Sequence, residues 1–308
     1  MKKKGIDVFL EPLILFREIV MKNKAPTRQH SDFIESASVT ALMRALLSEK
    51  DNSNPDYLAK YFVSPNWQHF LVNINKSIED LLVRVPGCMH YHLVRTKQFD
   101  ESLLHWIKNN NSGQIIILGS GLDSRSIRFY DHLHNFKVYE LDLKSMLEYK
   151  EKVILEKINK KHKSIFIPIN FGTENLLDIL KQNSIPKHSP TFILWEGVSY
   201  FLNKETVVDL FNNIKNYFIK DCTIVFDYAY KQYIDGNLNF FGATELNREL
   251  KNIGEPHIFG IDPDNILTFA KELNWNLINN YKAIDLEKKF LDNSLRVHGF
   301  HGIAEFRN

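Results

Sequence analysis

Five short runs rich in β-branched and aromatic residues constrain this fold most strongly, because segments of helical periodicity separate them. The runs are QIIILG at 114–119, KVYELD at 137–142, SIFIPI at 164–169, TFILWE at 191–196 and CTIVFD at 222–227. Strands that alternate with helices form a mainly parallel sheet with helices on both faces. The sequence therefore predicts an α/β fold. Two closing strands are expected in the tail, in NWNLINNYKAIDL and GFHGIAEFRN.

The residues before the first strand differ in pattern and predict a helical region over 1–105. In SASVTALMRALLSEK the apolar residues recur at helical spacing, with Ser36 or Ser38 as the expected N-cap. The first twenty residues carry a basic start, but charged residues and a proline interrupt the apolar run, so we expect neither a signal peptide nor a membrane span. The predicted organisation is a helical cap over 1–105 and an α/β domain over 106–308.

Two further helices are predicted in the second half of the chain. One begins after Asn203 and presents a single apolar stripe to the sheet, and the other opens at Asp262-Pro263. Residues 228–261 interrupt the rhythm with glycines, aromatic residues and mixed charge, just beyond the fifth strand. Open α/β sheets bind ligands beyond the carboxyl ends of their strands. We therefore predict a variable substrate or lid insertion at 228–261.

The charge and cysteine content exclude several classes of partner. The 308 residues carry 39 basic and 37 acidic side chains, a formal charge of +2, so no charge excess recruits nucleic acid or a membrane surface. Cys88 and Cys222 are too few and too far apart for a disulfide framework or a cysteine-rich zinc site. We expect a cytoplasmic protein without a metal site. The pair His90 and His92 lacks further ligands and is interpreted as structural.

The first strand runs directly into Gly119-Ser120-Gly121, a turn that lets the backbone approach a ligand closely. About twenty residues later the second strand ends in Asp142, where a carboxylate can accept hydrogen bonds from ribose hydroxyls. This order predicts a nucleoside cofactor. A dinucleotide fingerprint would place a third glycine where Ser124 stands, and Asp123 would lie close to a pyrophosphate. Both residues disfavour an NAD-dependent oxidoreductase, which stays open as an alternative, as does a non-catalytic nucleoside-binding module.

Three motifs resemble the leucine carboxyl methyltransferase family and its bacterial relatives. They are IIILGSGLDSRSIRF, VYELDLKSMLEYKEKVI and LWEGVSYFLNKETVVDLFNNI, and the upstream segments SASVTALMRALLSE and RTKQFDESLLHWI are similar to the family as well. The resemblance implies a Rossmann-like class I methyltransferase fold with a mainly parallel seven-stranded sheet, an N-terminal helical cap, and S-adenosyl-L-methionine as cofactor. It covers residues 36–220.

The resemblance also implies roles for individual residues. Arg95 matches the arginine that grips the methionine carboxylate, Asp142 the ribose-binding acid, and Glu196 the glutamate beside the sulfonium. The residues implied to contact the cofactor are Arg95, Gly119, Ser120, Gly121, Asp142, Asn170, Phe171 and Glu196. Asn170-Phe171 departs from the family's Asp-Leu pair, although an amide oxygen can still accept from the adenine amine and a phenyl ring can pack on the base.

The methyl acceptor is predicted less directly. A carboxylate acceptor needs no base at neutral pH, whereas a hydroxyl would benefit from one. The candidates for the acceptor pocket are Tyr200, Tyr228, Tyr230 and His257, with His298 and His301 as further possible bases. We expect a small-molecule acceptor or a protein C-terminus, and the sequence predicts no oligomeric state. Asp123 and Arg125 are interpreted as a local structural pair.

Overall fold

The computed structural model describes residues 30–292 and 294–308, so the interpretation of the first twenty residues lies outside the described part. The strands are β1 (Gly113–Leu118), β2 (Phe136–Asp142), β3 (Ser164–Pro168), β4 (Thr191–Trp195), β5 (Cys222–Tyr230), β6 (Gly260–Ile261), β7 (Asn276–Lys282) and β8 (His301–Arg307). Their order in the sheet is β3-β2-β1-β4-β5-β8-β7, with β6 paired to β5. β1 to β6 are parallel, and β8 runs antiparallel to both of its neighbours. The predicted fold class is confirmed, and β6 adds a two-residue strand to the expected seven.

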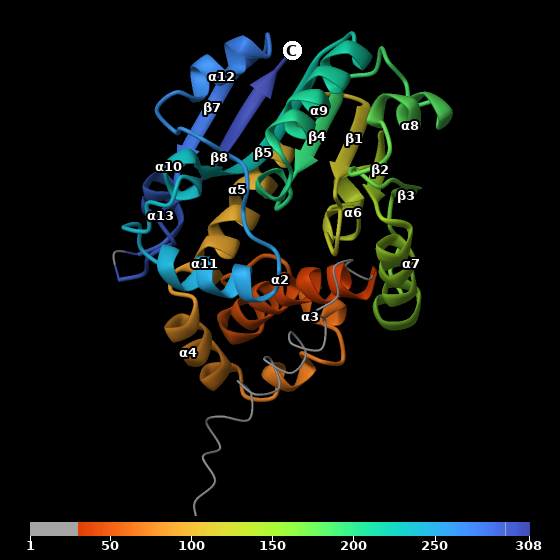
Figure 1. Cartoon of the computed structure of the whole chain (residues 1–308). Helices are drawn as coiled ribbons and strands as arrows, with labels where there is room; N and C mark the ends of the chain where they lie inside the picture. Colours follow the sequence, from red (N-terminus) through yellow and green to blue (C-terminus); the bar gives the residue numbers. More distant parts are fainter. Residues whose placement is uncertain (1–29, 293) are drawn as a thin grey trace, which may run out of the picture.

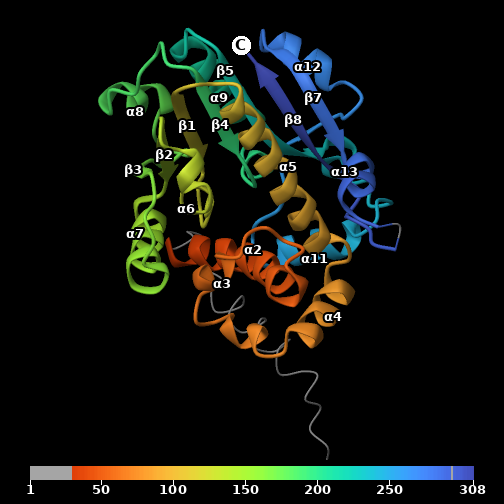
Figure 2. The same cartoon turned by 180° about the vertical axis from the view of Figure 1, so that it is seen from behind.

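The helices form two layers on the sheet and a third group at its carboxyl edge. They are α2 (His30–Asp51), α3 (Ala59–Phe62), α4 (Ile74–Arg84), α5 (Cys88–Lys108), α6 (Arg125–Arg128), α7 (Lys144–Val153), α8 (Leu176–Gln182), α9 (Lys204–Tyr217), α10 (Lys231–Ile234), α11 (Ala243–Asn252), α12 (Ile266–Glu272) and α13 (Ala283–Phe290). Figure 1 shows α8 and α9 in front of the sheet, and Figure 2 shows α5 and α13 on the opposite face. The helices α2, α3 and α4 lie below the arrowheads of the parallel strands.

The alternation of side chains along β1 fixes these layers. Ile116 and Leu118 pack into the core beneath α8, α9 and α12, whereas Ile115 and Ile117 pack into the core beneath α5 and α13. A third core joins α2, α4 and α7. The four consecutive apolar residues of β1 are therefore buried on both faces of the sheet, as expected for a central parallel strand.

Two helix starts differ from the prediction. The helix that contains Ser36 and Ser38 begins earlier, at His30, so neither serine is an N-cap. Instead the Ser38 hydroxyl accepts from the backbone amide of Ser64 at 2.7 Å. The helix expected to open at Asp262 begins at Ile266, because Asp262 accepts from the Asp264 amide and holds a turn before the helix.

The cap expected for α9 is present, since the Asn203 side chain accepts from the Thr206 amide at 2.8 Å. The two cysteines, Cys88 and Cys222, are buried and unbridged. Within the described ranges, no helix combines the length and the apolar character needed to cross a bilayer.

Candidate active site

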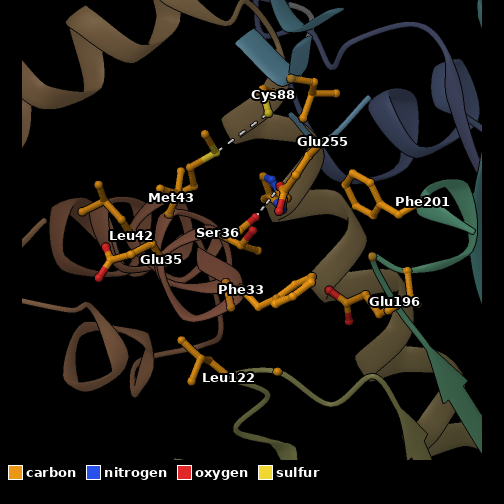
Figure 3. A pocket seen from close by; sticks show the side chains of 18 of the residues that line it. Phe33, Glu35, Ser36, Leu42, Met43, Cys88, Leu122, Glu196, Phe201 and Glu255 are labelled. Carbon is orange, nitrogen blue, oxygen red and sulfur yellow. Dashed lines mark hydrogen bonds between the residues drawn. The ribbon is translucent and has the colours of Figure 1, made fainter. Parts of the chain in front are cut away.

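A cavity of about 1590 Å³ lies at the carboxyl edge of the parallel strands, between the sheet and the helical group. The segment 228–261 closes one side of it, because α11 lies against α2 and α4 (Figure 1). Arg84 on α4 contacts Glu249 on α11 at 2.7 Å, and the Ser36 hydroxyl donates to Glu255 at 2.7 Å. Figure 3 looks into the cavity and shows the hydrogen bond between Ser36 and Glu255 in its wall, with Glu196 on the sheet side. The volume exceeds that of a typical single-ligand pocket of roughly 300–1,000 Å³, so a nucleoside cofactor and an acceptor fit together.

The glycine turn after β1 and the acid after β2 form one unit. Gly119 and Gly121 have φ of +62° and +45°, a region that side chains rarely adopt. The Asp142 carboxylate accepts from the Gly121 amide at 2.6 Å and from the Leu143 amide at 2.7 Å. Burial raises the pKa of Asp142, and these two amides oppose that rise. Each carboxylate oxygen keeps a lone pair for another donor, so pinning the turn and binding a ribose are compatible.

Asn170 and Phe171 follow β3 and line the same cavity. The Asn170 amide oxygen accepts from the Gly172 amide at 2.9 Å and thereby forms a local turn. Phe171 is half-buried and packs against the main core. An amide oxygen has a second lone pair, so the turn leaves it able to accept from an adenine amine.

Arg95 lies in the middle of the site, on α5. Its Nη1 donates to Asp227 at 2.9 Å and to the Tyr200 hydroxyl at 3.1 Å. Its Nη2 lies 2.9 Å from Nδ1 of His92, which must be the acceptor because a guanidinium can only donate. Its Nε lies 3.0 Å from Glu196 but lacks the angle of a hydrogen bond.

Glu196, directly after β4, bridges two arginines. Its carboxylate contacts Nη1 of Arg125 at 2.8 Å as well as Arg95. Burial favours the neutral acid, but Arg125 and Arg95 outweigh it and lower the pKa of Glu196 to about 2. Arg125 also pairs with Asp123, as the sequence predicts for a local pair, and its backbone amide donates to the same carboxylate at 2.6 Å.

A second ion network ties the glycine turn to the helical group. Asp56, in the turn between α2 and α3, accepts from the Ser124 hydroxyl at 2.5 Å and pairs with Arg44 at 2.9 Å. Arg44 in turn donates to the Leu122 carbonyl at 3.0 Å. Arg125 and Arg128 both contact Asp100 on α5 at 2.7 Å. Because these contacts join distant segments, sequence inspection missed Arg44, Asp56, Asp100, Arg128 and Asp227.

The sequence did contain one signal for Asp227, because a charged residue ends the mainly apolar run CTIVFD. In the structure Asp227 is fully buried. An ion buried in this way needs a partner, and that partner is Arg95. The gap of 132 residues between the two hides the pair in the sequence.

The acceptor candidates separate into two groups. Tyr200 and His257 line the cavity, and their rings lie 4.3 Å apart. Tyr228 and Tyr230 do not line it and are instead fixed in the core, which differs from the prediction. The Tyr228 hydroxyl donates to Asn280 at 2.7 Å, and the Tyr230 hydroxyl accepts from the Ala283 amide at 2.9 Å.

The other four histidines that the sequence analysis names lie in different places relative to the cavity. His298 and His301 line the cavity and are buried. His90 lies outside it, with Nδ1 3.0 Å from the Arg296 carbonyl oxygen. His92 lines the cavity and contacts Arg95.

Unsatisfied polar groups test whether S-adenosylmethionine fits this cavity. The Ser120 hydroxyl and Nε of Arg95 are buried, line the cavity, and have no hydrogen-bond partner among the described residues. A side chain at Gly121 would project into the cavity, because the nearest atom to its Cβ would be Cβ of Ala37 at 4.0 Å. A zwitterionic methionyl group offers oxygen acceptors to both unpaired donors. The residues present therefore fit the cofactor.

The strand order, the glycine turn and the acid after β2 are those of the class I methyltransferase fold. Two solved structures share this fold. One, from Thermobifida fusca and assigned as a methyltransferase, gives a TM-score of 0.54 at 14% identity over 86% of this chain and 93% of its own. The other, a DUF574 family protein of Streptomyces avermitilis, gives 0.52 at 10% identity over 75% and 89%.

The family follows from the sequence match. Residues 37–215, more than half of the chain, match the model of the leucine carboxyl methyltransferase family. This chain belongs to the leucine carboxyl methyltransferase family.

Curated relatives carry names of the same kind. A Streptomyces coelicolor protein assigned as an S-adenosyl-L-methionine-dependent methyltransferase is 27% identical over 197 residues, which are 59% of this chain and 63% of the relative. A Mycobacteroides abscessus protein assigned likewise is 34% identical over 133 residues, 41% of this chain and 42% of the relative. The matched part thus spans less than two thirds of either relative.

Proposed function

We propose that this chain is an S-adenosylmethionine-dependent O-methyltransferase that acts on a carboxylate or hydroxyl of a small molecule or of a protein C-terminus. The observation that carries the proposal is the pairing of the Gly119–Gly121 turn with Asp142 in the same cavity as Arg95 and Glu196. Family membership supports the same conclusion.

In this proposal different residues contact different parts of the cofactor. Arg95 holds the methionine carboxylate, Asp142 the ribose hydroxyls and Glu196 the region of the sulfonium. The methionyl and adenine parts are assigned to Gly119, Ser120, Gly121, Asn170 and Phe171. S-adenosylmethionine supplies a methyl group that its positive sulfur has already activated. The protein aligns the acceptor and excludes water, which is the larger part of catalysis when no bond to the protein forms.

The donors that Arg95 still has support these roles. Arg95 pairs with Asp227 and lies 3.0 Å from Glu196, and Arg125 is a second cation beside Glu196, so the methionine carboxylate would be the third carboxylate beside two guanidinium groups. The N–H groups that remain, Nε and one on Nη2, lie in one plane and suit a bidentate carboxylate. Glu196, held ionised by two arginines, places a negative charge in the same cavity, which suits a sulfonium.

The organisation of the chain is part of the proposal. The helical region over 1–105 acts as a cap on the α/β domain over 106–308, and the segment 228–261 acts as the substrate lid. A cytoplasmic setting is consistent with the two buried thiols. The partners are the cofactor and the acceptor, without nucleic acid or membrane.

Calorimetric titration with S-adenosylmethionine, S-adenosylhomocysteine and NAD tests the proposal. Micromolar binding of both sulfur nucleosides without an NAD signal is expected. Asp142→Asn should weaken that binding roughly 10–100-fold, about 1.4–2.7 kcal/mol. Asp178→Asn, at an exposed position on α8, is the matched control and should bind normally. Binding of NAD alone would show that the site belongs to an oxidoreductase, and binding without any methyl transfer would indicate a non-catalytic module.

A further inference from the structure

The polar row along the carboxyl edge continues beyond the proposed cofactor residues. Asp142 ends β2, the glycine turn follows β1, Glu196 follows β4, Asp227 lies on β5, and His301 begins β8. His301 is paired with Ala229 of β5 in the sheet. Three strand spacings separate β1 from β8, roughly 14 Å. The row therefore has a part proposed for the cofactor on β1 to β4 and a second part on β5 and β8.

Five aromatic side chains, one of them on β8, surround that second part and are here called the His–Tyr cluster. They are Tyr91, Tyr200, His257, His298 and His301, and all of them line the cavity. The ring of His301 is central, with its centroid 4.5 Å from His298 and 5.2 Å from His257. The rings of Tyr91 and Tyr200 each lie 5.0 Å from it.

The cluster holds several polar atoms that nothing in the described chain satisfies. Both ring nitrogens of His298 and of His301, Nδ1 of His257 and the Tyr91 hydroxyl have no hydrogen-bond partner there. His298 and His301 are only 2% and 1% exposed. Each unsatisfied buried polar group costs about 1–3 kcal/mol. Several such groups converging on one cavity indicate a site for a polar ligand.

The charge of the cluster selects among polar ligands. Burial first, and then neighbouring charges, hold the pKa of His298 and of His301 well below the usual value, so both rings are neutral at pH 7. Among the described residues, Arg95 contacts the cluster through Tyr200, but it pairs with Asp227 and Glu196 and in the proposed function also holds the methionine carboxylate, so it is not available to a charged acceptor. A buried carboxylate needs a cation of its own, whereas a hydroxyl needs one acceptor and one donor. A neutral imidazole supplies both, and flat rings pack well against an aromatic ligand.

We propose that the His–Tyr cluster is the acceptor subsite, that its ligand is an uncharged hydroxyl on an aromatic ring, and that His301 accepts the hydroxyl proton during transfer. This inference rests on the proposed function. The hydroxyl oxygen gains the methyl group and loses its proton to a ring nitrogen of His301. The sulfur keeps the electron pair of the broken S–C bond and loses its positive charge as His301 gains one, so the net charge of the cavity is unchanged although burial disfavours the protonated ring. His301 passes the proton to solvent once the product leaves.

Matched probes test the acceptor class. The purified full chain is first titrated with S-adenosylhomocysteine, and that complex is then titrated with 2-naphthol and with 2-naphthoate. Methyl transfer from S-adenosylmethionine to each probe is measured in parallel, together with the pair phenol and benzoate. The hydroxyl probes should bind and be methylated at least 10-fold better than the carboxylates.

His301→Gln tests the proton acceptor, because glutamine keeps a donor and an acceptor but cannot take up the proton. We expect kcat for the hydroxyl probes to fall at least 100-fold, within the range of roughly 10²–10⁴ for general bases. KM and S-adenosylhomocysteine affinity should stay within about threefold. His188→Gln, at an exposed position before β4, is the matched control.

The outcomes separate the two proposals. If no sulfur nucleoside binds, the proposed function itself fails. If the nucleosides bind and a carboxylate is methylated while the naphthol is inert, the chain is a methyltransferase but the acceptor class is wrong. Cofactor binding with no binding or turnover of the hydroxyl probes also overturns the acceptor class, and an unchanged kcat in His301→Gln overturns the role of His301.

Discussion

Replacing Arg95 with alanine is the sharpest test of the structural reasoning, because one side chain neutralises two carboxylates. Asp227 is fully buried and lies 2.9 Å from Nη1, and Glu196 lies 3.0 Å from Nε. Glu196 keeps a partner in Arg125 after the substitution. Asp227 keeps the amide of Gly197, at 2.7 Å, but loses the cation.

The expected cost follows from that unpaired carboxylate. Removing one partner of a buried ion pair costs about 3–5 kcal/mol. Burial already raises the pKa of Asp227, so protonation limits the loss and places it toward the lower end of that range. Cofactor affinity should fall as well, by more than the roughly 10–100-fold expected from one charged hydrogen bond.

Urea unfolding of the wild type and of Arg95→Ala measures this cost as a free energy of unfolding. The control is Arg307→Ala, whose half-exposed ion pair with Asp221 spans 3.7 Å and should contribute less than about 1 kcal/mol. In a double variant, Asp227→Asn should recover part of the loss because it removes the stranded charge. A loss below about 1 kcal/mol in Arg95→Ala, or no recovery in the double variant, would refute the argument.

Three further expectations concern the same cavity. Phe171→Ala should weaken S-adenosylmethionine binding only about 2–10-fold, since stacking adds roughly 0.5–1.5 kcal/mol beyond area, and a calorimetric loss above 100-fold would contradict a stacking role. Ser120→Ala should leave the free energy of unfolding unchanged or higher, because it removes an unsatisfied hydroxyl, while weakening the cofactor about 2–10-fold. Burial holds the pKa of His301 well below its ordinary value of 6.5 in the folded chain, so only the unfolded chain takes up that proton as pH falls below 6.5. Stability is therefore full above the ordinary pKa of histidine and falls progressively below it, by at most about 1.4 kcal/mol per pH unit for this histidine. In His301→Gln the free energy of unfolding should fall less steeply as the pH is lowered. An identical pH slope in both proteins would contradict this prediction.

The sheet could be predicted from the sequence because its signal is local. β1, β3, β4 and β5 each contain a continuous run of at least three apolar residues, and such a run has few alternative environments. Helix starts were less predictable. Ser38 has the chemistry of a cap, but it lies within α2 and accepts from Ser64 across a loop. Asp262 also has that chemistry, yet it accepts from the Asp264 amide in a turn, and the helix begins four residues after it, at Ile266.

The candidate site was predictable where its residues lie next to strand ends in motifs, as for Asp142 and Glu196. The sequence could not show which face of a strand meets the cavity. Asp227 reaches Arg95 at the cavity wall, whereas Tyr228, the next residue along β5, points to the opposite face and contacts Asn280. His301 was one of several histidines in the sequence, and only its pairing opposite Ala229 brings it to the cavity.

The bond from Ser124 to Asp56 and the bond from Arg44 to the Leu122 carbonyl connect the glycine turn to α2 and α3. A ligand that stabilises the turn must therefore also lower the population of the opened form of these helices, beyond the effect of any direct contact with α2. Ligand binding adds RT ln(1 + [L]/Kd) to the stability of every unit that opens together with the site. Amide hydrogen exchange would register this as slower exchange in α2 when cofactor is added. The helical region is thus energetically coupled to the proposed cofactor site, although it is remote from that turn in sequence.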